Sequence, residues 1–195
     1  MRKESQLTAL IIVDMQKGMS PTFCKQKRNN SEAEANIAEL LSAWRKRNFP
    51  IVHVRHISRT VGSPFWPGQP GAEFQEALQP LSSEHVVEKN VPDAFIHSGL
   101  ERWLQVRDIN QLVIVGVSTN NSVEASARSA GNLGFATKVI SDATYTFDKV
   151  DYSGVLRKAS EVHAMSLANL QGEYAKIVAT SKALLIDTQP NKRGL

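Results

Sequence analysis

The sequence predicts an α/β fold: a three-layer, doubly wound sheet, mostly parallel, of about six strands with helices on both faces. Three observations predict it. Several short apolar runs are uninterrupted rather than alternating, which is typical of strands covered on both faces. Segments with apolar residues at helical spacing separate these runs along the chain. Polar residues follow directly after several of the runs, at the strand ends where sheets of this class bind ligands.

The composition suits a single globular domain spanning residues 1–195. Of the 195 residues, 42% are hydrophobic and 22% are charged, which suffices for a sizeable core. The single cysteine, Cys24, excludes an internal disulfide and suits a reducing compartment. The N-terminal residues lack the apolar region of a signal peptide, and no apolar run approaches the ~20 residues of a membrane span. We therefore expect a cytoplasmic protein with no membrane partner.

The charge pattern indicates a small-molecule substrate rather than a nucleic acid. The formal net charge is +4, with two short basic clusters at residues 25–28 and 45–47. The first falls in a loop and the second at a helix end, where cations on a solvated surface are ordinary. They lack the interleaved aromatic residues of a nucleic-acid binding face. No glycine-rich nucleotide-binding motif is present, so we expect no cofactor.

The first half of the chain predicts two strands that flank a helix. Residues 8–13 form a short β-branched apolar run, which favours a buried strand. A helix is expected over 32–47, with Ser31 as its N-cap, followed by a strand at 51–54. Residues 56–83 form a long irregular segment rich in Pro and Gly, which is typical of a site wall, a lid or an oligomer contact.

The second half continues the alternation of strands and helices. Gly134, just past one of the predicted helices, is a typical C-terminal stop. Strands are expected at 85–88, 112–117, 137–140 and 175–180. Helices are expected at 98–106, from 119 or 120 to about 133, at 152–170 and at 181–186.

Three polar segments follow predicted strands and should meet at one edge of the sheet. Asp14 follows the first strand, Lys89 follows the strand at 85–88, and residues 118–122 follow the strand at 112–117 and open a helix. A carboxylate buried without a partner would be costly, and Lys89 can supply that partner. Asp14 could then accept a proton from a nucleophile, while N–H groups at the helix start suit an oxyanion. Each residue alone is more typical of a turn, a helix start or a solvated surface, so the prediction depends on their joint placement.

Three motifs resemble the isochorismatase-like cysteine hydrolase superfamily. Residues 13–16, Val-Asp-Met-Gln, resemble its D-x-Q motif, and residues 87–95 resemble its K-x-x-x-S-A-F segment. Residues 116–128 resemble its G-V-x-T-[ND]-x-C-V-x-x-T-A-R signature, the most specific of the three. The pairs Gly134-Phe135 and Asp142-Ala143 follow at the family's spacing. The resemblance extends over residues 7–180 and implies the same α/β fold.

The resemblance also implies a reaction and the residues that perform it. It implies an Asp-Lys-Cys triad that hydrolyses small amide, urea or carbamoyl-like C–N bonds through a thioester. Asp14 and Lys89 match this triad, and Ser122 occupies the position of the nucleophile. It further implies a cis peptide bond between Val117 and Ser118, with the N–H groups of Ser118 and Ser122 as oxyanion donors. Members of the superfamily are usually dimers or tetramers, so we expect a homodimer or a homotetramer.

Two positions depart from the family pattern. Asp93 occupies the serine position of the S-A-F segment, and Ser122 occupies the cysteine position. A serine hydroxyl is far less acidic than a thiol, and no histidine lies in the three motifs to serve as its base. Three explanations stay open. Ser122 could be an engineered replacement of a native cysteine. The protein could naturally lack the thiol and perform other chemistry, such as the vinyl-ether hydrolysis of isochorismatases with Asp14 as the acid. Alternatively, Ser122 could be a slow natural nucleophile, or the site could bind without catalysis.

Other residues near these motifs are expected to line the substrate site. Large side chains in the irregular segment and in the S-A-F segment could form an apolar wall. We expect no metal, because His53 and His56 lie three apart on or near a strand and should face opposite sides of it. The expected substrate-binding residues are Gln16, Phe65, Trp66, Phe95 and Asn121.

Overall fold

The fold is built on a six-stranded sheet in which every neighbouring pair of strands is parallel. The structure, a computed structural model, describes residues 7–185. The strand order is β3-β2-β1-β4-β5-β8, so the chain winds outward from β1 in both directions. The strands are β1 (Thr8–Val13), β2 (Ile51–His56), β3 (His85–Lys89), β4 (Gln111–Val117), β5 (Ala136–Tyr145) and β8 (Lys176–Val178). The predicted fold class is confirmed.

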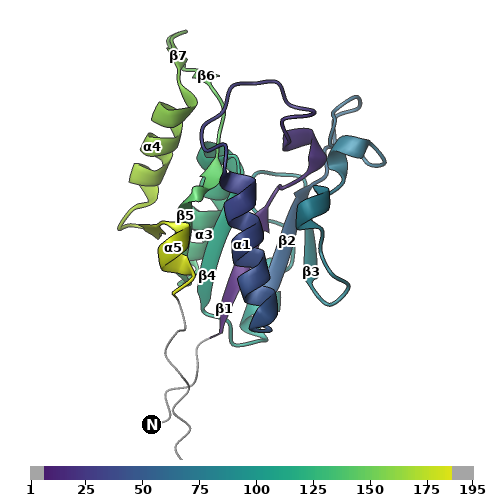
Figure 1. Ribbon diagram of the computed structural model, residues 1–195, viewed down its shortest axis with the longest axis vertical. Helices are drawn as coiled ribbons and strands as arrows, with labels where there is room; N and C mark the ends of the chain where they lie inside the picture. Colours follow the sequence, from purple (N-terminus) through teal and green to yellow (C-terminus); the bar gives the residue numbers. More distant parts are fainter. Residues whose placement is uncertain (1–6, 186–195) are drawn as a thin grey trace, which may run out of the picture.

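Helices cover both faces of this sheet (Figure 1). Side chains of α1 and α5 pack into the core on one face, and those of α2, α3 and α4 pack into the core on the other. The helices are α1 (Ala33–Lys46), α2 (Leu100–Gln105), α3 (Glu124–Asn132), α4 (Ala159–Leu170) and α5 (Thr180–Ala183). No helix within residues 7–185 is long and apolar enough to cross a membrane.

The uninterrupted apolar runs are explained by burial on both faces. In β1, Ile11 and Val13 join the core beneath α3, while Leu10 and Ile12 join the core beneath α1. All six residues of β1 are buried. Each fully buried branched side chain of this size stabilises the fold by about 1.5–3 kcal/mol. Burial on both faces also leaves the strand ends as the places where polar groups can gather.

Three details of the predicted secondary structure are wrong. The helix expected from residue 152 begins at Ala159, because residues 149–157 form a small hairpin of β6 (Lys149–Val150) and β7 (Leu156–Arg157). Strand β5 does not end before Asp142 but runs on to Tyr145. Ser31 does not cap α1: Glu32 occupies the cap position and its side chain makes no capping bond. The last predicted helix is confirmed only as the short α5, and its end at residue 186 lies outside the described residues.

Candidate active site

Asp14 leaves β1 in a conformation that turns its side chain out of the strand. Its φ angle is +53°, in the left-handed region that aspartate tolerates better than most residues. Its N–H still donates to the carbonyl of Val54 at 2.9 Å, which keeps the backbone attached to β2. The carboxylate therefore sits at the carboxyl end of the two central strands, where ligands bind in folds of this class.

Lys89 joins Asp14 and Ser122 in one buried contact. The Nζ atom of Lys89 donates to Oδ2 of Asp14 at 2.7 Å and to Oγ of Ser122 at 3.3 Å. The relative exposure of the three residues is 2% for Asp14, 3% for Lys89 and 6% for Ser122. The other carboxylate oxygen of Asp14, Oδ1, is buried without a hydrogen-bond partner among the described residues. It is therefore an available proton acceptor.

Burial opposes the charge of the Asp14 carboxylate. Removal from water raises the pKa of Asp14 above its usual value, and the Lys89 ammonium and the nearby Ser122 hydroxyl act in the opposite direction. A carboxyl group whose pKa is raised takes up a proton more readily than an exposed one and can return it. The arrangement therefore suits general acid–base chemistry at residue 122.

The turn that carries Ser122 follows β4 directly. The peptide bond between Val117 and Ser118 is cis, and residues 119–123 form one π-helical turn before α3 begins. Gly116, just before it, has a φ of +118°, and a Cβ atom there would lie 2.1 Å from the carbonyl oxygen of Val13. Only glycine allows β4 to pass this close to β1. The glycine of the third motif thus brings the turn against the strand that bears Asp14.

Ser126 connects this turn to the segment after Lys89. Its hydroxyl donates to the carbonyl of Ser122 at 2.7 Å and accepts the N–H of Ala94 at 3.0 Å. Asp93, the departure from the family pattern, accepts the N–H of Phe95 at 2.8 Å and a hydrogen bond from Ser129. One carboxylate oxygen of Asp93 is thus used within its own segment, and the other attaches this segment to α3.

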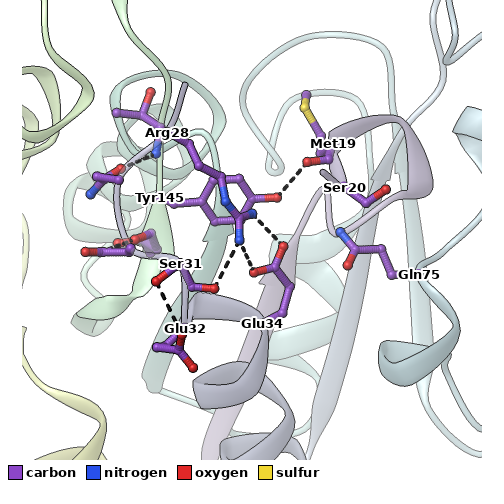
Figure 2. A network of polar contacts seen from close by, with 12 residues as sticks. Met19, Ser20, Arg28, Ser31, Glu32, Glu34, Gln75 and Tyr145 are labelled. Carbon is purple, nitrogen blue, oxygen red and sulfur yellow. Dashed lines mark hydrogen bonds and ion pairs between the residues drawn. The ribbon is translucent and has the colours of Figure 1, made fainter. Parts of the chain in front are cut away.

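A strap of residues 20–31 crosses the carboxyl ends of the strands (Figure 1). Figure 2 shows its anchor, in which the Arg28 guanidinium lies 4.3 Å from the centre of the Tyr145 ring and makes two hydrogen bonds to Glu34. The buried Tyr145 hydroxyl donates to the carbonyl of Met19 at 3.1 Å. The strap is therefore tied to the end of β5 on one side and to α1 on the other.

The predicted substrate-binding residues fall in different places. Phe65 and Trp66 are half-buried beside the site: Trp66 lines a hollow of about 600 Å³ together with Lys89, and the Phe65 ring packs edge-on to His56. Asn121 is exposed on the helical turn.

Two of the predicted residues have structural contacts instead. Gln16 is fully buried, and its amide donates to the carbonyls of His56 and Ala72 and accepts the N–H of His56. Phe95 packs against the core and against Phe135, with 5.9 Å between ring centres. Within residues 7–185, neither side chain forms a hydrogen bond with Lys89 or Asp14.

His56 and His163 are two residues near the site to which the sequence pattern gave no catalytic role. In the β2–β3 ladder His56 is the direct partner of Lys89. His163 on α4 lies 2.8 Å, through Nδ1, from the hydroxyl of Thr119 in the π-helical turn. His53 faces the other side of β2, where its ring contacts Glu84 at 2.8 Å. Within residues 7–185 there is no cluster of three His, Cys, Asp or Glu side chains that could hold a metal ion.

Comparisons with known proteins point to one family. The family model of the isochorismatase domain matches residues 8–180. The chain is 36% identical over 176 residues to the isochorismatase family protein YrdC of Bacillus subtilis, covering 90% of this chain and 94% of that protein. It is 45% identical, with a TM-score of 0.88, to the crystal structure of an isochorismatase-family protein from Chromobacterium violaceum, covering 94% and 95% of the two chains.

Relatives with named activities are more distant. Nicotinamidase 3 of Arabidopsis thaliana is 26% identical over 191 residues, covering 91% of this chain and 87% of that protein. Maleamate amidohydrolase of Pseudomonas putida is 28% identical over 117 residues, covering 60% of this chain and 50% of that protein. The match to the family model and the full-length similarity to YrdC show that the chain belongs to the isochorismatase family of hydrolases.

Proposed function

We propose that the protein hydrolyses a C–N bond in a small amide, urea or carbamoyl compound, with residue 122 as the nucleophile. The observation that carries this proposal is the buried contact of Lys89 with both Asp14 and Ser122. Oδ1 of Asp14 would accept the proton of the nucleophile, and the Lys89 ammonium would hold the negative charge of Asp14 beside it. The N–H groups of Ser118 and Ser122 would bind the oxyanion.

The named relatives support the class of substrate. A nicotinamidase and a maleamate amidohydrolase are both named for the hydrolysis of an amide of a small acid. The hollow of about 600 Å³ is lined by Lys89 and Trp66 but not by Asp14 or Ser122, and we propose it as the approach of a small molecule to the buried pair. We also propose that the protein is cytoplasmic and that it forms a homodimer or a homotetramer. Light scattering of the purified protein would test the oligomeric state.

Ammonia release from a panel of primary amides tests the proposed reaction. The panel should contain nicotinamide, maleamate and an N-carbamoyl amino acid, assayed with the protein and with Ser122→Cys and Ser122→Ala. We expect ammonia from the protein or from Ser122→Cys, and none from Ser122→Ala. Release that survives in Ser122→Ala, or no release from any form, would contradict the proposal.

A second candidate reaction is the hydrolysis of a vinyl ether without a covalent intermediate. The raised pKa of Asp14 favours it, because a protonated carboxyl group can act as the acid that such a reaction needs. It would leave Ser122 without a chemical role. Turnover of isochorismate at equal rates by the protein and by Ser122→Ala, with loss in Asp14→Asn, would favour this candidate over amide hydrolysis.

A further inference from the structure

His56 is placed beside the catalytic pair by the register of the sheet. His56 and Lys89 are direct partners in the parallel ladder of β2 and β3, and side chains of paired residues leave a sheet on the same face. The preceding pair shows the alternation, since Arg55 and Glu88 point together to the other face and form an ion pair. The His56 ring therefore stands next to the Lys89 side chain, on the face that carries Ser122.

The His56 ring has no hydrogen-bond partner among residues 7–185. The hydrogen bonds of this residue use only its backbone N–H and carbonyl, both with the Gln16 amide. The ring is half-buried and held edge-on by Phe65, with 6.1 Å between ring centres. A half-buried imidazole with fixed backbone and unused nitrogens is available to a bound molecule.

The charges around the ring keep it neutral and leave it able to take up a proton. Partial burial and the Lys89 cation lower the pKa of His56 below its usual value, whereas the Asp14 carboxylate acts in the opposite direction. Among residues 7–185, these two groups, at the end of β3 and just after β1, are the charged groups that act on His56. A neutral imidazole is the form that accepts a proton, and Asp14 stabilises the imidazolium that results.

A serine nucleophile needs such a group more than a cysteine does. A thioester can release a thiolate, but an ester at Ser122 must receive a proton at Oγ as its C–O bond breaks. In the first half-reaction, Asp14 can take the proton of Ser122 and give it to the departing amine. The hydrolytic water then still has to lose a proton, and Oγ has to gain one.

We therefore propose that His56 is the catalytic base of the second half-reaction, in which water hydrolyses the ester at Ser122. This proposal rests on the proposed amide hydrolysis. The water oxygen forms a bond to the acyl carbon while His56 takes a proton from that water. The bond between the acyl carbon and Oγ of Ser122 breaks as the imidazolium returns the proton to Oγ. The carboxylic acid leaves, and the serine and the neutral imidazole are restored without any further reactant.

Rapid-quench mass spectrometry of the acyl-enzyme tests this role. With an amide found by the ammonia screen, His56→Gln should still acylate Ser122 at a rate close to that of the unmodified protein. Its deacylation should be slower by about 10²–10⁴-fold, so that the adduct accumulates. The matched control is His85→Gln: His85 stacks on Trp103 at the opposite end of β3 and also has a pKa lowered by burial. It should accumulate no adduct.

The outcomes separate this inference from the proposed function. An adduct that decays at an unchanged rate in His56→Gln, or acylation and deacylation slowed equally, would overturn the role of His56 and leave amide hydrolysis standing. No adduct on Ser122 in any variant would overturn the role of His56, and it would overturn amide hydrolysis as well if Ser122→Cys released no ammonia. A measurement without substrate adds a check: the His56 pKa, followed by NMR, should fall in Asp14→Asn. A titration unaffected by this change would contradict its placement.

Discussion

Replacement of Lys89 by methionine measures the buried ion pair of the candidate site. The side chains of Lys89 and Asp14 are 0% and 3% exposed, and their charged atoms are 2.7 Å apart. Methionine fills a similar volume but leaves the Asp14 carboxylate buried without its cation, which costs about 3–5 kcal/mol if the carboxylate stays charged. Because burial already raises the pKa of Asp14, we expect the variant to bind a proton on folding instead.

This proton uptake gives the prediction its sign. The unfolded chain ionises Asp14 near its ordinary value, whereas the folded variant keeps it protonated, so the folded state binds more protons. Stability of Lys89→Met should then be nearly normal at low pH. Above the pKa that Asp14 has in the unmodified protein, the free energy of unfolding of Lys89→Met should fall relative to the unmodified protein by up to about 1.4 kcal/mol per pH unit.

Urea denaturation between pH 5 and pH 8 measures this dependence. Two variants serve as controls. Lys17→Met removes an ion pair whose side chains are 35% and 59% exposed, and it should cost no more than about 1 kcal/mol at every pH. Asp14→Asn combined with Lys89→Met removes the carboxylate, so the pH slope should vanish. A loss in Lys89→Met below about 1 kcal/mol at all pH values, or a loss independent of pH, would refute the reasoning.

Three further predictions concern the framework of the site. Gly116→Ala should destabilise the fold by about 3 kcal/mol or more in urea denaturation, because its Cβ would lie 2.1 Å from the Val13 carbonyl oxygen. The control Gly154→Ala, with open space around the new Cβ, should cost about 1 kcal/mol. Equal costs would contradict the close approach of β4 to β1. Ser126→Ala should lower the free energy of unfolding by about 1–3 kcal/mol, because it leaves the Ala94 N–H unpaired. Replacement of the exposed Ser160 by alanine should change it by no more than about 0.5 kcal/mol. An unchanged stability in Ser126→Ala would show that water replaces the hydroxyl. Burial raises the pKa of Glu84, but hydrogen bonds from Arg45, the Leu81 N–H and His53 hold it at about 2. Stability worth about 1–2 kcal/mol, after allowance for solvent screening, should therefore be lost as the pH falls from about 4.5 to about 2. Thermal melts of Glu84→Gln should lack this pH-dependent loss.

The sequence predicted the strands well where burial on both faces left a simple pattern. In β1 the apolar run and the buried strand coincide at residues 8–13. Asp14, Lys89 and Ser122 could be placed together because the ends of parallel strands meet at one edge. Their placement at this edge follows from the parallel sheet that the alternation of strands and helices predicts, whereas their contact also needs the order β3-β2-β1-β4.

Other features depended on contacts that a sequence pattern does not display. The register that pairs His56 with Lys89 could not be read from a strand expected to end at Val54. The hairpin after β5 was missed because Asp151 accepts the N–H groups of Ser153 and Val155, a local side-chain turn that overrides the helical spacing. The long β5 was missed because Asp142, expected after the strand, instead accepts the N–H and the hydroxyl of Thr180 at the start of α5.

The central claim is that Asp14, Lys89 and residue 122 act as one unit, and a mutant cycle on ammonia release measures this directly. Asp14→Asn, Lys89→Met and Ser122→Ala should be assayed singly and together, with folding checked for each. We expect each single change to lower kcat/KM by about 10³-fold or more and the triple variant to be no slower than the slowest single one. Losses that multiply across the three changes, or a single variant that keeps most of its activity, would contradict the account.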